Sequence, residues 1–127
     1  MHYQVELTND NDEDYKADLR VRAIGTWPKN PTEALIESIA KWEWIVKWME
    51  NNPGLPPPET GSSECALCRL YIADDCKGCP VKQKTRKTLC HGSPYDKYDD
   101  AVGQEAYYTA LMQANREVTF LKSLLPK

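Results

Sequence analysis

The sequence has no apolar run long enough to cross a bilayer and no stretch at its start that resembles a signal peptide. A membrane-spanning helix needs about 20 predominantly apolar residues, and no segment of the 127 residues approaches that length. The opening stretch, MHYQVELTNDNDEDYK, lacks the basic cluster and apolar core of a signal peptide. We therefore expect a cytoplasmic protein without membrane contacts, whose thiols are kept reduced. The cysteines number five, so they cannot all pair within one chain.

Histidine is scarce, and the signatures of common catalytic sites are missing. The two histidines, His2 and His91, are too few for most acid–base schemes. No glycine-rich phosphate loop occurs, and the zinc-deaminase pattern of His-x-Glu followed by Pro-Cys-x-x-Cys has no match. We expect a protein that is not an enzyme.

A hairpin and two helices account for most of the chain, whose length suits a single domain over residues 1–127. Residues 3–7 and 18–24 alternate between apolar and polar side chains, which predicts a β-hairpin within residues 1–27. Residues 30–52 predict a helix with Asn30 as N-cap, Pro31 at the first position and Glu33 two residues further on. Its expected core stripe has helical spacing and consists of Leu35, Ile39, Trp42, Val46 and Met49.

A second long helix is predicted over residues 99–125, where alanine, leucine and valine recur at helical spacing. Residues 53–95 between the two helices form a proline-rich linker, expected on the surface, followed by a loop that contains every cysteine. The predicted fold is α+β and mostly helical: two long helices joined by a zinc-stapled loop, with an N-terminal β-hairpin.

The cysteines follow a metal-binding pattern. Two Cys-x-x-Cys pairs lie seven residues apart, and Cys90 follows ten residues later, next to His91. Paired Cys-x-x-Cys units commonly present thiolates to one tetrahedral Zn²⁺. We expect zinc, held by four of the five cysteines, with His91 outside the ligand set. The candidates are Cys65, Cys68, Cys76, Cys79 and Cys90.

Other interpretations of the cysteines are weaker. Buried free thiols are possible, because cysteine packs as a small apolar residue. A redox Cys-x-x-Cys usually accompanies a thioredoxin-like βαβ pattern, which the sequence lacks. An iron–sulfur cluster is the main alternative, because CKGCP resembles the Cys-Pro end of ferredoxin motifs. Ferredoxins, however, separate successive cysteines by two residues, where this chain has seven.

The cysteine block resembles that of a group of small, largely uncharacterised tailed-bacteriophage proteins. Their shared pattern is Cys-x-x-Cys, then Cys-x-Gly-Cys-Pro, then Cys-x-Gly-Thr/Ser-Pro-Tyr, between a Trp-rich helix and a long helix. The resemblance covers roughly residues 35–125 and implies a phage protein with a metal site, without an established activity. The matching positions are Cys65, Cys68, Cys76, Gly78, Cys79, Pro80, Cys90, Gly92, Ser93, Pro94 and Tyr95.

Two segments are candidates for partner contacts. Trp44 and Trp48 lie four residues apart, off the core stripe, and with Ile45 they predict an aromatic surface for a host or phage protein. The alternative is that the hairpin or the last helix covers them. Although the net charge is −3, residues 77–87 contain no acid, and nucleic-acid binding is the second hypothesis. Its candidate residues are Lys82, Lys84, Arg86 and Lys87.

Overall fold

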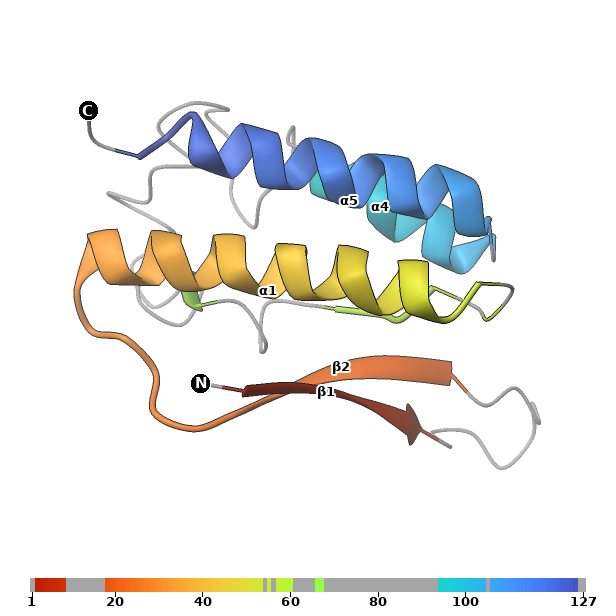
Figure 1. Cartoon of the computed structure of the whole chain (residues 1–127), viewed down its shortest axis with the longest axis horizontal. Helices are drawn as coiled ribbons and strands as arrows, with labels where there is room; N and C mark the ends of the chain where they lie inside the picture. Colours follow the sequence, from red (N-terminus) through yellow and green to blue (C-terminus); the bar gives the residue numbers. More distant parts are fainter. Residues whose placement is uncertain are drawn as a thin grey trace.

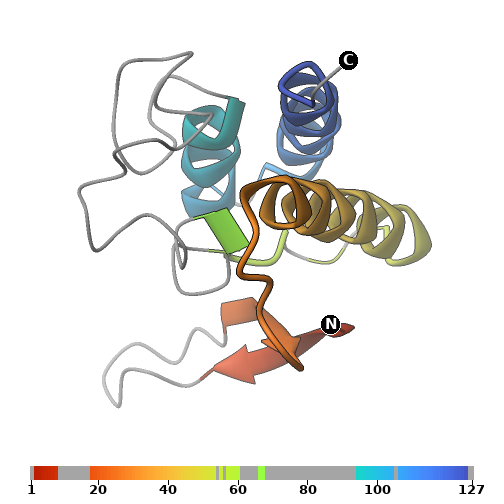
Figure 2. The ribbon, with the colours of Figure 1, turned by 90° about the vertical axis from the view of Figure 1, so that its left-hand side faces the viewer.

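Figure 1 shows the computed structural model, which describes residues 2–8, 18–53, 55, 57–60, 66–67, 94–104 and 106–125. The hairpin lies on one side of the first helix, and the other two helices lie on its opposite side (Figures 1 and 2). The arrangement confirms a mostly helical α+β fold with an N-terminal hairpin. The elements are β1 (His2–Thr8), β2 (Asp18–Ile24), α1 (Pro31–Asn51), α4 (Pro94–Gly103) and α5 (Tyr107–Lys122).

The hairpin packs on α1 through one face. β1 and β2 pair antiparallel, with Val5 opposite Val21, and the Val21 side chain is completely buried. The Tyr3 hydroxyl donates to the Glu37 carboxylate on α1. On the opposite face of the sheet Arg22 Nε lies 3.0 Å from a Glu6 carboxylate oxygen, and both side chains are exposed. The predicted alternation of apolar and polar positions therefore sets which face meets the helix.

Helix α1 begins as its sequence predicts. The Asn30 side-chain oxygen accepts from the backbone N–H of Thr32 at 2.8 Å and from that of Glu33 at 3.4 Å. Both amides lack a partner within the helix, so the cap satisfies donors that would otherwise face water. Every residue of the predicted core stripe is buried, which confirms the face by which α1 joins the core: Leu35, Ile39, Trp42, Val46 and Met49.

The prediction of one helix over residues 99–125 is wrong. The structure has two helices, because α4 begins at Pro94 and ends at Gly103, and α5 begins at Tyr107. The Ala106 N–H bonds to the carbonyl of Ala101, five residues back, at 2.9 Å, as at a Schellman helix end. Ala106 has ψ 89°, outside the helical range. The chain therefore reverses, and α5 runs back beside α4 and antiparallel to α1 (Figure 1).

Residues 57–60 lie in the interior, so this part of the predicted surface linker is wrong. Pro57, Pro58 and Thr60 are buried. The backbone of Glu59 adds to the outer edge of β2, accepting from Val21 N–H at 2.8 Å and donating to Leu19 C=O at 2.7 Å. Proline has no N–H to donate. The bridge to β2 therefore uses the N–H and the C=O of Glu59, the residue that follows Pro58.

An aromatic cluster joins α1 to α4. The rings of Trp42 and Tyr98 meet edge to face, with centroids 4.9 Å apart, and Tyr95 approaches Trp42 at 6.0 Å. Edge-to-face contact is the favoured geometry for such pairs. The Tyr98 hydroxyl donates to the Pro58 carbonyl at 2.6 Å. Tyr98 thereby links α4 both to α1 and to the buried segment.

We expect the Tyr98 hydroxyl to contribute a pH-dependent part of the stability. Burial, with smaller contributions from Tyr95 and Asp99, raises the pKa of Tyr98 above its ordinary value. The contribution is therefore fully present below the unfolded pKa of about 10 and is lost as the pH rises above it. Tyr98→Phe should cost on the order of 1–2 kcal/mol, because the Pro58 carbonyl loses its donor.

Urea unfolding of both proteins at a series of pH values up to about 11 tests this expectation. The wild type should lose stability more steeply than Tyr98→Phe above pH 10, with the gap between them closing. Equal pH slopes for the two proteins would contradict a buried, protonated Tyr98.

Candidate protein-binding surface

The predicted metal ligands lie outside the described residues. These are Cys65, Cys68, Cys76, Cys79 and Cys90, and the same holds for His91. Within the described part of the chain, no three His, Cys, Asp or Glu side chains gather as metal ligands would. The zinc site and the iron–sulfur alternative therefore stay predictions.

The structure does show what holds the two ends of the cysteine-bearing segment. The Tyr95 hydroxyl, at the start of α4, donates to the Thr60 carbonyl at 2.8 Å. The buried Lys41 ammonium on α1 donates to the Thr60 hydroxyl at 3.1 Å and lies 5.0 Å from the centre of the Trp42 ring. Thr60 and Tyr95, which are described on either side of this segment in the sequence, therefore lie next to each other.

Two more contacts position this part of the chain. Ala66 and Leu67, which separate Cys65 from Cys68 in the sequence, are buried in the core. The buried Glu117 carboxylate on α5 accepts from the Tyr95 N–H at 3.0 Å, one of the first amides of α4. A carboxylate at a helix N-terminus is favoured by the helix dipole as well as by the hydrogen bond. The N-terminus of α4 is therefore held both by Thr60 and by Glu117 of α5.

The aromatic surface predicted on α1 is largely covered. Ile45 is completely buried, so it contributes nothing to a surface, and that part of the prediction is wrong. Trp44 and Trp48 are half-buried against the core. The Trp44 ring lies 6.1 Å from the ring of Tyr3, so the hairpin covers part of it. Both tryptophans keep some exposed area, and their role in partner binding stays a prediction.

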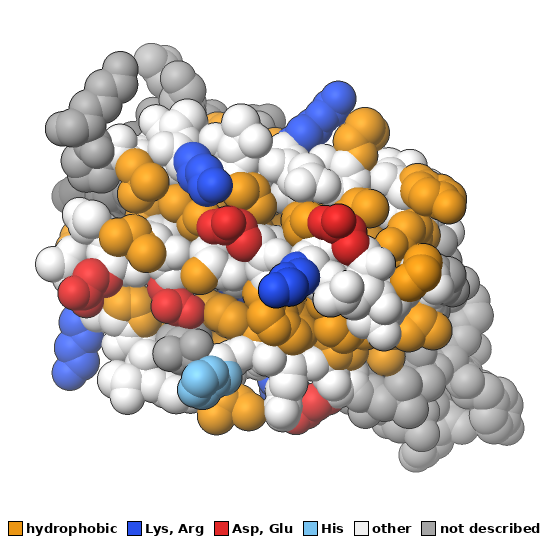
Figure 3. Space-filling view, viewed as in Figure 1, with side chains coloured by type: hydrophobic (Ala, Val, Ile, Leu, Met, Phe, Trp, Pro, Cys, Tyr) orange, Lys and Arg blue, Asp and Glu red, His pale blue; other side chains and the backbone are white. Residues whose placement is uncertain are grey.

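The basic residues of the nucleic-acid hypothesis also lie outside the described residues. They are Lys82, Lys84, Arg86 and Lys87. On the face formed by α1 and α5, acidic and basic side chains alternate with hydrophobic ones, as Figure 3 shows. Across this face Lys122 lies 3.9 Å from Glu43. That face carries no single-sign field of the kind that attracts nucleic acid.

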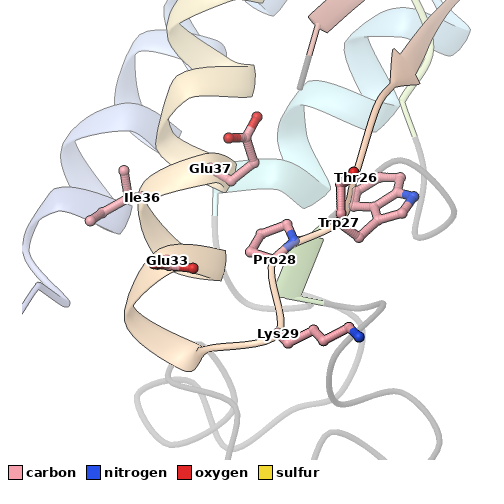
Figure 4. A pocket seen from close by; sticks show the side chains of 7 residues that line it. All are labelled: Thr26, Trp27, Pro28, Lys29, Glu33, Ile36 and Glu37. Atoms are coloured by element: carbon pink, nitrogen blue, oxygen red, sulfur yellow. The ribbon is translucent and has the colours of Figure 1, made fainter.

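A hollow lies at the junction of the hairpin and α1. We call it the junction pocket; it has a volume of about 570 Å³. One wall is the segment that leaves β2, and the other is the first two turns of α1 (Figure 4). Its lining residues are Thr26, Trp27, Pro28, Lys29, Glu33, Ile36 and Glu37.

The chemistry of the junction pocket is mixed. Trp27, Pro28 and Ile36 supply apolar surface, and Ile36 is 52% exposed although it lies on a helix. Two carboxylates, Glu33 and Glu37, line the same hollow with one ammonium. Ile24, at the end of β2 just before the pocket segment, is another exposed apolar side chain. Apolar side chains exposed together beside acidic ones suit a contact with another protein.

Exposed apolar residues also occur on the outer side of α5. Tyr108 is 83% exposed and Met112 is 45% exposed, one helical turn apart. A shallower hollow is lined there by Met112, Asn115, Arg116, Thr119 and Phe120. Tyr108 does not line this hollow, which has fewer lining residues than the junction pocket, so it is the weaker candidate.

Sequence reasoning missed the junction pocket. A signal existed, because Ile36 immediately follows Leu35 and so falls outside the predicted core stripe. Trp27 and Pro28 are likewise apolar residues directly before a helix cap. What the sequence could not provide was the angle between the hairpin and α1, which brings these residues together.

Comparison with known proteins adds no assignment. The chain matches no protein-family model, and neither the comparison with curated proteins nor that with solved structures found a match. Among the described helices, none combines the length and apolar character that a bilayer crossing requires.

Proposed function

We propose that the chain is a small protein-binding factor, not an enzyme, whose partner inserts an apolar side chain into the junction pocket. The exposure of Ile36 carries the proposal. A large aliphatic side chain that is half exposed and lines the same hollow as Pro28 and Trp27 gains free energy when a partner covers it. Buried apolar anchors at the centre of a contact supply most of the affinity of protein interfaces.

The charges around the pocket indicate the chemistry of the partner. Glu33 and Glu37 outnumber Lys29 there, so the hollow is acidic, and a basic group beside the apolar anchor complements it. Glu37 also accepts from the Tyr3 hydroxyl, which fixes one carboxylate in place. The partner segment therefore carries a large apolar residue flanked by lysine or arginine.

The cysteine segment has a supporting role in this proposal. Four of its five thiolates bind one zinc ion, and the binding energy becomes folding energy, because the ligands are not assembled in the unfolded chain. The contacts of Thr60 and Tyr95 support this role, since they hold both ends of the segment in one place. An iron–sulfur cluster is the alternative for the same ligands.

The setting of the function rests on the resemblance to phage proteins. A phage-encoded factor of this kind acts in the host cytoplasm on a host or phage protein. Nucleic-acid binding through residues 77–87 is the competing function, and the binding experiment below separates the two.

Elemental analysis of protein expressed with zinc and iron both supplied should find about one zinc per chain. Replacing each cysteine singly by serine should abolish zinc binding in four variants and lower their melting temperatures. The remaining variant identifies the spare cysteine and serves as the matched control. About four iron atoms per chain with visible colour would indicate a cluster instead. If the wild type bound no metal, both assignments would be wrong.

Ile36→Arg should weaken partner binding by about 2 kcal/mol or more, because it removes the apolar contact and adds a charge that repels a basic segment. The fold should persist, since arginine is a good helix former and lies three residues after Glu33. Tyr108→Arg is the matched control, because Tyr108 is an exposed helix residue outside the pocket. Partners captured from host lysate with nucleic acid digested are identified and then measured individually by calorimetry.

Unchanged affinity of a folded Ile36→Arg variant would overturn the pocket assignment. The predicted aromatic surface is then tested by replacing Trp44 and Trp48 with alanine. Capture is repeated from lysate in which nucleic acid is left intact. Nucleic acid that is captured there with a steep salt dependence, and that is lost only when the basic residues of 77–87 become glutamine, would establish the nucleic-acid function instead.

A further inference from the structure

The outer side of α5 carries a protruding ring and a hollow next to each other. α5 lies on the opposite side of α1 from the hairpin (Figures 1 and 2). Tyr108, near its start, is 83% exposed and does not line the hollow that follows along the helix. Exposed residues recur on this side at a spacing of four, three and four, which is the spacing of a seam between packed helices. They are Tyr108, Met112, Asn115 and Thr119.

The hollow has the form that receives a side chain from a facing helix. In helix packing, one protruding side chain inserts into a hole made by four residues of the neighbouring helix. Four lining residues of this hollow stand at positions i, i+3, i+4 and i+7 of α5, and Phe120 adds an aromatic wall. These four are Met112, Asn115, Arg116 and Thr119. The volume of about 520 Å³ leaves room for an aromatic ring.

The polar groups of the hollow are already bonded in part within α5. The Asn115 side-chain amide donates to the Leu111 carbonyl at 3.0 Å, and the Thr119 hydroxyl donates to the Asn115 carbonyl at 3.3 Å. Burying a polar group costs free energy mainly when the group loses its hydrogen bond to water without a replacement. These internal bonds lower the cost of covering the hollow, while Met112 and Phe120 supply apolar surface that gains from being covered.

We propose that α5 packs antiparallel against α5 of a second copy of the chain, so that the Tyr108 ring of each copy fills the hollow of the other. Because ring and hollow lie on the same helix, one antiparallel contact satisfies both copies and closes with a two-fold axis. The axis passes beside Met112, which meets Met112 of the second copy, and methionine adapts well to such contacts. The residues of this surface do not line the junction pocket, so the dimer is independent of the proposed function.

Charge favours the antiparallel orientation over the parallel one. Of the described residues that line the hollow, Arg116 alone is charged. In the antiparallel dimer its guanidinium lies beside the Tyr108 ring of the other copy, where a cation is attracted to the face of the ring. The two Arg116 residues are then about 12 Å apart along the helices, at a rise of about 1.5 Å per residue. A parallel pairing would place Arg116 opposite Arg116, which is unfavourable, and would leave both hollows unfilled.

Sedimentation velocity over a range of concentrations tests the dimer. The wild type should approach twice 14.5 kDa, and a mass that stays at 14.5 kDa up to about 1 mM protein would overturn the proposal. Tyr108→Ala should raise the dissociation constant about tenfold or more, because it removes the central ring, whereas Tyr108→Phe should still associate. Ile36→Ala is the matched control, since Ile36 is an exposed apolar helix residue outside this surface. Equal association of Tyr108→Ala and Ile36→Ala would also overturn the proposal.

A charge exchange tests the orientation of the two helices. Tyr108→Arg places a cation beside Arg116 of the other copy and should weaken association strongly. Combining it with Arg116→Glu should restore association, because position 108 of one copy faces position 116 of the other. In a parallel dimer the double variant would place like charges opposite each other at both positions. If the double variant associated no better than Tyr108→Arg alone, the antiparallel pairing would be wrong.

NMR on a mixture of isotope-labelled and unlabelled wild type gives a test that needs no variant, because it detects contacts between copies separately. The Tyr108 ring should show nuclear Overhauser effects to the Thr119 methyl group and to the Phe120 ring of the other copy. Contacts between the Tyr108 rings of the two copies would indicate parallel pairing instead. A dimer in which Tyr108 shows no contact to the other copy would contradict the proposal.

Discussion

Residues 57–60 are the segment on which the rest of the fold depends. Glu59 hydrogen-bonds to β2 through its backbone. The Pro58 carbonyl accepts from Tyr98 of α4, and Thr60 bonds to Lys41 of α1 and Tyr95 of α4. This short segment thus connects three elements that are distant in the sequence, namely β2, α1 and α4. Each of its bonds is buried or partly buried, so a lost partner leaves a polar group without water.

This connection bears on where the two candidate functional regions lie. The hairpin is held against α1, and that placement brings residues 26–29 next to Ile36 to form the junction pocket. The same segment leads directly into the cysteine block, whose other end enters α4 beside Thr60. A change in the cysteine block therefore reaches the helices through Tyr95 and Thr60.

The sequence predicted what depends on local pattern. The Asn30 cap, the core stripe of α1 and the alternating strands all follow from spacing within a few residues, and the structure has each of them. It did not predict the break before Tyr107, because the alanines and valines around it continue at helical spacing. At the reversal the Ala106 N–H bonds to the Ala101 carbonyl, a contact that the spacing of apolar residues does not reveal.

The sequence also did not predict which polar residues are buried. Lys41, Glu117 and Thr60 have the composition of surface residues, and they are buried because partners from other elements reach them. Such partners lie 19 to 22 residues away in the chain, so no local pattern reveals them. The same reason explains the proline run, whose composition is typical of an exposed linker, although the Pro58 carbonyl accepts a hydrogen bond from Tyr98 of α4. For the candidate site, the local pattern indicates that Ile36 lies outside the core stripe of α1. It does not indicate that residues 26–29 line the same hollow.

Native-state hydrogen exchange tests most directly whether residues 57–60 hold the fold together as one unit. The amides of Glu59 and Val21, which form the bridge to β2, should open with the same free energy as the core amides of Ile45 and Ala114. Equal values mean that the segment, the hairpin and the helices unfold together. If Glu59 and Val21 opened at a much lower free energy while the helical amides stayed protected, the segment would be an addition to a self-sufficient helical core, which contradicts this account.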